Sequence, residues 1–228
     1  MIRMSHVHKT YPTQIAALTD INLEITPGQF VFLMGPSGSG KTTLLHILFC
    51  SERPTSGQVI VNGMEITRKD FKKIYLLRRR IGMVFQDYKL LKDRTVGENI
   101  AFALEVTDHP PAEIKKRVLE IVKWVGLLGR ERDSVLTLSA GEKQQVAIAR
   151  AVINNPPLLL ADEPTGNLDE EMTQGVMKLF IALHRQGTTV VFATQNGDLV
   201  RRFSYPVIRL QKGKRMDPEP GIDVIAGT

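Results

Sequence analysis

The sequence predicts an α/β fold in which buried strands alternate with helices. Three apolar runs, at residues 29–34, 158–161 and 188–193, have the composition of fully buried strands. A glycine-rich loop and an apolar helical stretch follow the first run, and an amphipathic helix at 170–185 follows the second. A strand, a glycine-rich loop and a helix in that order form a P-loop, the phosphate-binding turn of many nucleoside triphosphatases.

The glycine-rich loop contains every fixed position of the phosphate-binding pattern. It comprises Gly35, Pro36, Ser37, Gly38, Ser39, Gly40, Lys41, Thr42 and Thr43. Glycines let backbone N–H groups approach phosphate oxygens closely, and the start of the next helix adds unpaired donors. We expect Lys41 to reach the β- and γ-phosphates and the Thr42 hydroxyl to hold Mg²⁺. A turn that merely joins a strand to a helix would not need all these positions, so the chain is predicted to bind a nucleoside triphosphate.

The composition is typical of a cytoplasmic globular protein. Of the 228 residues, 43% are hydrophobic and 24% are charged, which suits one core or a core with a small subdomain. No apolar run approaches the roughly 18 residues that a membrane helix needs, and the first residues do not resemble a secretion signal. The single cysteine, Cys50, excludes an internal disulfide and suits a reducing compartment. We expect the chain to reach a membrane only through another protein.

Positive charge is concentrated in one stretch of a chain whose formal net charge is +6. The stretch comprises Arg68, Lys69, Lys72, Lys73, Arg78, Arg79 and Arg80, interleaved with Phe71 and Tyr75. A solvated basic face is the simplest interpretation. No helix-turn-helix, zinc or RNA-binding pattern supports a nucleic-acid partner, and proximity to acidic lipid headgroups is the alternative.

Two strands and a tyrosine precede the P-loop. Residues 2–8 and 21–25 have strand patterns, and a Pro-Gly turn leads from the second into the buried strand. Tyr11 lies between the two strands, 24 residues before Gly35. It is either an ordinary packing residue or the flat ring on which an adenine stacks, and the neighbouring P-loop favours the second interpretation.

A hairpin and a short buried strand follow the first helix. Residues 58–62 alternate as a strand, and the Asn-Gly pair at 62–63 predicts a tight turn. Residues 81–85 form the buried strand, and Gln86 follows its end. A lone glutamine after a strand usually has no special role, but the neutral amide of Gln86 could coordinate Mg²⁺ or hold water near a γ-phosphate, and the motifs that follow favour this role.

Three helices are predicted next. Residues 98–106 and 112–128 have helical periodicity with apolar stripes that indicate core packing. A third helix begins at Ser139, which forms a predicted capping box with Glu142. The box explains both residues structurally, but a helix start that carries Ser139 and Gly141 is also suited to bind phosphate.

Adjacent carboxylates end the buried strand at 158–161. Downstream of a P-loop, Asp162 is expected to hold Mg²⁺ through its water shell, and Glu163 to orient or deprotonate the attacking water. The alternative is two exposed acids at the start of a loop. The remaining pattern predicts a strand at 207–210 and a loosely ordered tail after residue 212.

Taken together, these motifs resemble those of the ATP-binding subunits of ABC transporters over nearly the whole chain. Any one motif is a weak signal, but the set in the family's order is specific. The matches are the P-loop to the Walker A motif, Tyr11 to the adenine-stacking loop, Gln86 to the Q-loop, residues 138–142 to the signature motif, Asp162 and Glu163 to the Walker B motif, and residues 167–169 to the D-loop.

The resemblance implies a single ABC ATPase domain with a RecA-like P-loop core, an antiparallel β subdomain and a small α-helical subdomain. Residues 1–86 and 155–215 would form the core with its β subdomain. Residues from about 87 to 154 would form the helical subdomain that carries the signature motif, and 216–228 the tail.

The resemblance also implies a mechanism. Two copies would face each other head to tail, with each ATP between one copy's Walker A motif and the partner copy's Ser139, Gly141 and Glu142. Asp169 of the D-loop would also contact nucleotide. A separate integral membrane protein would dock on the loop at 88–95, which places the chain on the cytoplasmic face of a bacterial inner membrane.

Within the family, the runs at 81–87, 94–96 and 163–169 are similar to those of ATPases that act in bacterial cell division. Members of that branch drive a membrane partner that switches on cell-wall hydrolases. The ATPases of lipoprotein-releasing and macrolide-export systems share the run at 163–169 and are the alternative. A soluble ATPase that acts on DNA would carry a coiled-coil or zinc-hook insertion, which this sequence lacks, so no nucleic-acid partner is expected.

The sequence departs from the family pattern at Gln195, where the family has a histidine that contacts the γ-phosphate. The glutamine amide can donate a hydrogen bond to phosphate but cannot carry a positive charge. Losing one charge-stabilising contact costs about 2.7–4 kcal/mol in a transition state. We therefore expect intact ATP binding and dimerisation with slow hydrolysis, and a non-enzymatic binding role is the alternative. Ala140 replaces the usual signature glycine, and we expect a mild effect.

Overall fold

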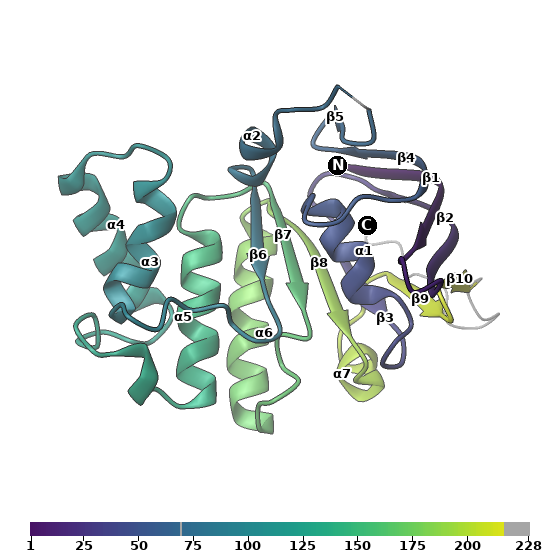
Figure 1. The fold of residues 1–228 in the computed structure, drawn as a ribbon. Coiled ribbons are helices and arrows are strands. Elements are labelled where there is room, and N and C mark those ends of the chain that lie inside the picture. Colours follow the sequence, from purple (N-terminus) through teal and green to yellow (C-terminus); the bar gives the residue numbers. More distant parts are fainter. Residues whose placement is uncertain (69, 217–228) are drawn as a thin grey trace.

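A six-stranded, mostly parallel sheet forms the centre of the computed structural model, which describes residues 1–68 and 70–216 (Figure 1). Its order is β10 (Lys214–Met216), β9 (Val207–Gln211), β3 (Phe30–Met34), β8 (Thr189–Thr194), β7 (Leu158–Asp162) and β6 (Ile81–Val84). All neighbours pair in parallel except β10, which is antiparallel to β9. Because β3, β7 and β8 are parallel neighbours, the residues that follow them emerge at one edge of the sheet.

Helices cover both faces of this sheet. Helix α1 (Lys41–Leu48) packs on the face formed by alternate residues such as Val31 and Leu160. Helices α5 (Ala140–Val152), α6 (Glu170–Arg185) and α7 (Gly197–Arg202) pack on the other face, against residues such as Phe32 and Phe192. Burial on both faces explains why the strands are continuous apolar runs rather than alternating ones.

A second, antiparallel sheet of four strands packs beside α1, on the far side from α3 (Val96–Glu105) and α4 (Pro111–Trp124) (Figure 1). Its order is β2 (Ala16–Ile25), β1 (Ile2–Thr10), β4 (Ser56–Val61) and β5 (Met64–Glu65). The turn between β4 and β5 has positive φ angles at Asn62 (50°) and Gly63 (77°), as the Asn-Gly pair predicts. Apolar residues of β1 and β4 join the core that contains α1.

Helices α3 (Val96–Glu105) and α4 (Pro111–Trp124) form a separate apolar cluster with part of α5. Helix α3 begins with a capping box at Thr95 and Glu98. Helix α4 begins with Pro111 at a position where the missing N–H costs nothing, and Gly126 at φ 85° follows its end. The structure thus contains the two helices predicted at 98–106 and 112–128, with bounds shifted by a few residues.

Two α-helices and one strand were absent from the expectation. Helix α2 (Ile74–Arg78) lies inside the basic stretch, and α7 begins two residues after Gln195, where the Asn196 side chain accepts a hydrogen bond from the Leu199 backbone N–H. Strand β10 (Lys214–Met216) corrects the prediction that the chain is loosely ordered after residue 212. The rest of the predicted tail, 217–228, lies outside the described residues.

Strand β2 starts at Ala16, five residues before the predicted strand. Register shifts interrupt the pairing of β1 with β2, and His6 and Asp20 have positive φ angles of 50° and 51°. Such bulges break the two-residue alternation on which the prediction depended. Among the helices of the described ranges, none combines the length and the apolar content that crossing a bilayer would require.

Candidate functional site

The glycine-rich loop connects the end of β3 to the start of α1, and its shape depends on two glycines. Gly40 precedes the helix at φ 105°, and a Cβ there would lie 2.6 Å from the carbonyl oxygen of Ala17. A Cβ at Gly35 would lie 2.3 Å from the carbonyl oxygen of Leu210. Ser37 and Gly38 are exposed at the tip. The loop therefore packs tightly against neighbouring backbone while its tip faces solvent.

Ser39 is a buried polar residue of this loop with an unused hydroxyl. Its side chain is 2% exposed, and within the described residues its Oγ has no hydrogen-bond partner. Buried polar groups are normally paired, so an unpaired one inside a phosphate-binding loop is consistent with a ligand that supplies the partner.

Lys41 lies in the interior of the loop rather than in solvent. Its Nζ donates to the carbonyl oxygens of Gly35 at 2.8 Å and Pro36 at 3.2 Å. It also lies 3.1 Å from the Glu163 carboxylate, with side-chain exposures of 6% and 11%. The structure thus joins the predicted phosphate-binding lysine to the predicted catalytic carboxylate.

Asp162, at the end of β7, is 3% exposed and has an oxygen, Oδ1, without a hydrogen-bond partner among the described residues. Burial raises the pKa of Asp162, and a hydrogen bond with the Thr42 hydroxyl and the charges of His46 and Lys41 offset part of that rise. A buried carboxylate oxygen beside a hydroxyl is a donor set that Mg²⁺ accepts, since this ion uses one or two carboxylates together with substrate phosphates. The residues present therefore fit the predicted metal.

Glu163 has a strained backbone, with φ of 46° in a residue that is not glycine. Its N–H donates to the Ala193 carbonyl, and its Oε2 accepts a hydrogen bond from the backbone N–H of Gln195 at 3.2 Å. The ends of β7 and β8 thus hold this carboxylate between Lys41 and Gln195. The side chain of Gln195 itself is exposed.

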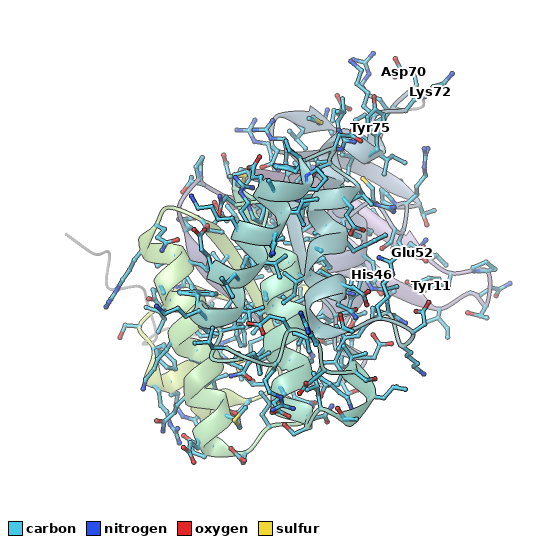
Figure 2. All side chains as sticks on the ribbon, turned by 90° about the vertical axis from the view of Figure 1, so that its left-hand side faces the viewer. Tyr11, His46, Glu52, Asp70, Lys72 and Tyr75 are labelled. Atoms are coloured by element: carbon cyan, nitrogen blue, oxygen red, sulfur yellow. The ribbon has the colours of Figure 1, made fainter. Side chains whose placement is uncertain are left out.

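Tyr11 and Gln86 lie at the border of the site formed by the P-loop, Asp162 and Glu163. The Tyr11 hydroxyl is 3.3 Å from the Thr43 hydroxyl, and Lys9 Nζ lies 4.7 Å from the centre of the Tyr11 ring. Figure 2 shows Tyr11, Glu52 and His46 on one side of the molecule. Gln86 is exposed two residues after β6, whose Val84 pairs with Ala161 of the Asp162 strand. Tyr11 therefore borders the P-loop, and Gln86 follows a strand that ends at the same sheet edge.

The predicted signature residues form the capping box at the start of α5. Ser139 Oγ accepts from the Glu142 N–H at 3.3 Å, and Glu142 accepts from the Ser139 N–H at 2.8 Å. Glu142 also pairs with Arg130 at 2.6 Å. Hydrogen bonds from the Ser139 N–H and hydroxyl, together with the pairing with Arg130, lower the pKa of Glu142. The capping box is therefore confirmed, and it leaves Ser139 exposed.

Ser139 and the P-loop do not meet within one chain. Helix α5 packs on one face of the central sheet and α1 on the other, as Figure 1 also shows. No hydrogen bond or ion pair links Ser139 to residues 35–43 in the part of the chain that the structure describes. The predicted phosphate contact of Ser139 therefore requires a nucleotide held by another copy.

Gly141 instead packs against the start of α6. A Cβ at Gly141 would lie 2.0 Å from Met172 Cε. Asp169 is the N-cap of α6, and its side chain accepts from the Met172 N–H at 2.8 Å. The structure thus brings two predicted nucleotide-binding residues, Gly141 and Asp169, into contact with Met172, which no sequence pattern indicated.

A cleft of about 780 Å³ lies between α2, the end of α1, β6, α3 and α5. Both apolar and basic residues line it; the main ones are Phe49, Ile74, Met83, Phe85, Phe102, Val106, Arg78, Arg79, Lys89 and Arg150. Arg150 donates to the carbonyl oxygens of Lys89 and Tyr88, each at 2.7 Å, and burial lowers its pKa. The cleft was not predicted, because its walls come from five separate elements.

The predicted docking loop at 88–95 borders this cleft and is held by Asn99. The Asn99 side chain, which is fully buried, accepts from the Leu91 N–H at 2.8 Å and donates to the carbonyl oxygens of Leu91 at 3.0 Å and Thr95 at 2.9 Å. This amide adds side-chain hydrogen bonds to the backbone of the loop and so fixes its position beside α3. Asn99 is thus a positioning residue that sequence reasoning missed.

Comparison with known proteins agrees with this geometry. The sequence profile of the ABC transporter family matches residues 18–166. The cell division ATP-binding protein FtsE of Bacillus subtilis is 46% identical over 213 residues, which cover 93% of each chain. The protein of the same name from Escherichia coli strain K12 is 44% identical over 213 residues, which cover 93% of this chain and 96% of that one.

Among solved structures, a dimeric ATP-binding cassette in a post-hydrolysis state, bound to ADP and Pi, matches with a TM-score of 0.89 and 37% identity, covering 96% of this chain and 98% of that chain. The α/β fold class and the family predicted from the motifs are therefore confirmed. This chain belongs to the ABC transporter family of ATPases, where the relatives described above carry the name FtsE.

Proposed function

We propose that this chain is the ATP-binding and ATP-hydrolysing subunit of a membrane complex that acts in bacterial cell division. The observation that carries the ATPase part is the contact between Lys41 and Glu163, because it joins a P-loop lysine to a carboxylate suited to activate water. The names of the relatives, cell division ATP-binding protein FtsE, support the cellular role. In this proposal the core with its β subdomain spans 1–86 and 155–215, and the helical subdomain spans about 87–154.

Nucleotide binding uses groups that are already in place. The N–H groups of the P-loop, the Ser39 hydroxyl and Lys41 receive the phosphates, and Tyr11 stacks on the adenine. Thr42 and Asp162 hold Mg²⁺, and Gln86 reaches the same site from the end of β6. When bound, Mg²⁺ neutralises charge on the β- and γ-phosphate oxygens. The unpaired oxygens of Ser39 and Asp162 support this assignment.

Hydrolysis depends on Glu163. A phosphate that accepts hydrogen bonds from Lys41 competes with Glu163 for this cation, so the carboxylate becomes available to accept a proton from water. The Gln195 N–H still holds the other carboxylate oxygen and fixes its direction. Gln195 in place of a histidine leaves one charge-stabilising contact unmade, which slows the step.

Two copies complete each site. The helix start at Ser139, Gly141 and Glu142 of one copy, where Ser139 is exposed, covers the γ-phosphate on the other, and Asp169 lies near it through the shared contact with Met172. The placement of α1 and α5 on opposite sheet faces supports this arrangement, and so does the dimer of the related cassette. ATP bound at the interface stabilises the dimer, and its hydrolysis releases it.

The membrane partner docks in the cleft beside the loop at 88–95. A cleft lined by both apolar and basic residues fits a short amphipathic helix that carries acidic residues. In this proposal the partner is an FtsX-like integral membrane protein, the chain lies on the cytoplasmic face of the inner membrane, and the complex regulates cell-wall hydrolases outside it. A lipoprotein-releasing or macrolide-type exporter is the second candidate, because it shares the run at 163–169.

Two measurements test the proposal. The rate of ATP hydrolysis is compared between the parent chain and Glu163→Gln, and equal rates would favour a non-enzymatic binding role. The tagged chain is then purified with native membranes, and the bound membrane protein is identified. An FtsX-like protein supports the division role, whereas an exporter permease or a lipoprotein-releasing permease would replace it with the second candidate.

A further inference from the structure

The whole net charge of this chain lies in the thirteen residues 68–80, called here the basic segment. The segment contains seven of the 30 Lys and Arg residues and one of the 24 Asp and Glu residues. The other 215 residues contain 23 of each and are formally neutral. A pI near 9.5 is thus the property of one surface rather than of the whole molecule.

Most of this charge is free to act on a partner. Lys72, Lys73 and Arg80 are exposed and form no ion pair within residues 1–68 and 70–216. Arg79 donates to the carbonyl oxygen of Val106 at 3.0 Å, and its one ion pair within the described residues is a long contact of 3.6 Å with the exposed Asp108. Arg78 donates to the carbonyl oxygens of Phe49 at 3.2 Å and Cys50 at 3.1 Å, which hold its charge in place without neutralising it.

The described part of the basic segment, residues 68 and 70–80, projects away from the nucleotide site. Helix α2 precedes the amino end of β6, whereas the P-loop follows the carboxyl end of β3 in the same parallel sheet (Figure 1). Figure 2 shows Asp70 and Lys72 at the outermost part of the molecule, far from Tyr11 and His46. A ligand of the basic segment therefore does not compete with ATP.

The segment shares a rim with the cleft described above. Tyr75, Arg78 and Arg79 line that cleft, and the Tyr75 side chain is 60% exposed. An exposed tyrosine among cations suits the boundary between water and a bilayer, where its ring and hydroxyl meet different environments. A membrane protein docked in the cleft would bring this rim toward the lipid headgroups.

We propose that the basic segment binds the anionic phospholipid headgroups of the bilayer beside the docked partner. Its orientation toward the membrane rests on the docking proposed above, but its charge and exposure do not. Each Lys or Arg near an anionic surface strengthens binding about fivefold, and the attraction weakens when salt shortens the screening length. The contact would add to the affinity of the partner and set the angle of the ATPase under the membrane.

The test uses the isolated full chain and sedimenting vesicles, with no membrane protein present. One set of vesicles is phosphatidylcholine alone, and the other contains about 30% phosphatidylglycerol, enough to give an anionic surface. We expect binding to the anionic set only, with release at about 0.5 M salt. Equal binding to both sets, or none to the anionic set, would overturn the proposal.

A matched pair of double variants locates the contact. Lys73→Gln with Arg80→Gln removes two cations of the basic segment that do not line the cleft, and vesicle binding should weaken on the order of 25-fold. Lys115→Gln with Lys123→Gln removes the same charge from exposed positions on α4 and should bind like the parent. Equal losses of vesicle binding in both double variants would contradict the assignment of the contact to the basic segment, because binding would then depend only on the net charge of the chain.

Two further measurements distinguish lipid binding from nucleic-acid binding and from the ATPase function proposed above. Tighter binding to a short duplex DNA than to anionic vesicles in the same salt would assign the segment to nucleic acid instead. The rate of ATP hydrolysis in solution should be the same in both double variants and the parent. A chain that hydrolyses ATP and dimerises but ignores anionic vesicles would contradict the lipid contact alone and leave the ATPase proposal intact.

Discussion

Lys41 Nζ lies 3.1 Å from Glu163 Oε1, and protein atoms almost fully cover both side chains. This ion pair joins the P-loop to the end of β7. In it, Glu163 binds the Lys41 ammonium group that we propose to bind the phosphates. The same carboxylate accepts a hydrogen bond from the Gln195 N–H. In the function proposed above, ATP binding to Lys41 releases Glu163 to act as the catalytic base, and the predictions below follow from this proposal.

Replacing Glu163 with glutamine should stop hydrolysis while ATP still binds. The amide keeps the size of the side chain but cannot accept a proton from water, so turnover should fall by at least about 10²-fold, the usual contribution of a general base. Affinity for ATP should rise or stay equal, because Lys41 no longer has a competing anion. Turnover is measured by phosphate release and affinity by fluorescence of a labelled nucleotide. Unchanged turnover would remove Glu163 from the chemistry.

Replacing Gln195 with histidine should raise the rate of hydrolysis. A histidine adds a donor that can carry positive charge toward the γ-phosphate, and contacts of this kind contribute about 10²–10³-fold. The backbone N–H that holds Glu163 is unaffected by the change. Phosphate release is compared with that of the parent and of Gln195→Asn, which is not expected to gain. A histidine variant no faster than the parent would refute the slowing assigned to Gln195.

Replacing Asp162 with asparagine should stabilise the nucleotide-free chain near neutral pH. Burial raises the pKa of Asp162, so the folded chain holds this proton at pH values where the unfolded chain has released it. The resulting stability is present at low pH and is lost as pH rises from the ordinary Asp pKa through the raised one. The variant should lack this decline and gain about 1 kcal/mol at pH 7, since an unpaired buried charge disappears.

Urea unfolding between about pH 4 and pH 8 measures this effect, since carboxyl groups titrate in that range. The exposed carboxylate Asp93 provides the matched control, and Asp93→Asn should follow the parent curve. The Asp162 variant should also lose the strengthening of ATP binding by Mg²⁺. An asparagine variant that is less stable than the parent at neutral pH, with the pH dependence intact, would contradict the assignment.

Two loop glycines should respond differently to alanine. Both have positive φ angles, 105° at Gly40 and 74° at Gly38, so both variants bear backbone strain. Only Gly40 faces other atoms, because its Cβ would lie 2.6 Å from the Ala17 carbonyl, whereas Gly38 has nothing within 4 Å. Gly38→Ala should cost about 1 kcal/mol of unfolding free energy and Gly40→Ala about 2–4 kcal/mol. Equal costs would mean that β2 does not constrain the loop.

The sequence predicts the chemistry of this site better than its surroundings. The P-loop, the carboxylates at the end of β7 and the helix at 170–185 follow local rules, and each appears where those rules place it. Helix α7 and strand β10 are too short and too polar for periodicity to detect. The early part of β2 was missed because bulges at His6 and Asp20 interrupt its alternation.

The features of the site that the sequence did not predict depend on contacts between segments that are distant in the chain. The pairing of Lys41 with Glu163 and the packing of Gly141 on Met172 join residues that are far apart in the chain. The positive φ of Glu163 is imposed by the hydrogen bonds of neighbouring strands rather than by its own preference. Sequence patterns indicate which residues are present at a site, whereas the sheet order determines which of them meet.

The central claim is that ATP is held between two copies, and the mass of Glu163→Gln in solution tests it most directly. Light scattering should show a monomer without nucleotide and a dimer at saturating Mg-ATP. Adding Ser139→Ala should abolish the dimer, whereas Thr95→Ala, which removes the equivalent cap of α3 at a similar cost of about 1 kcal/mol, should preserve it. A Glu163→Gln chain that remains monomeric at saturating Mg-ATP, or a dimer that persists without the Ser139 hydroxyl, would contradict the account.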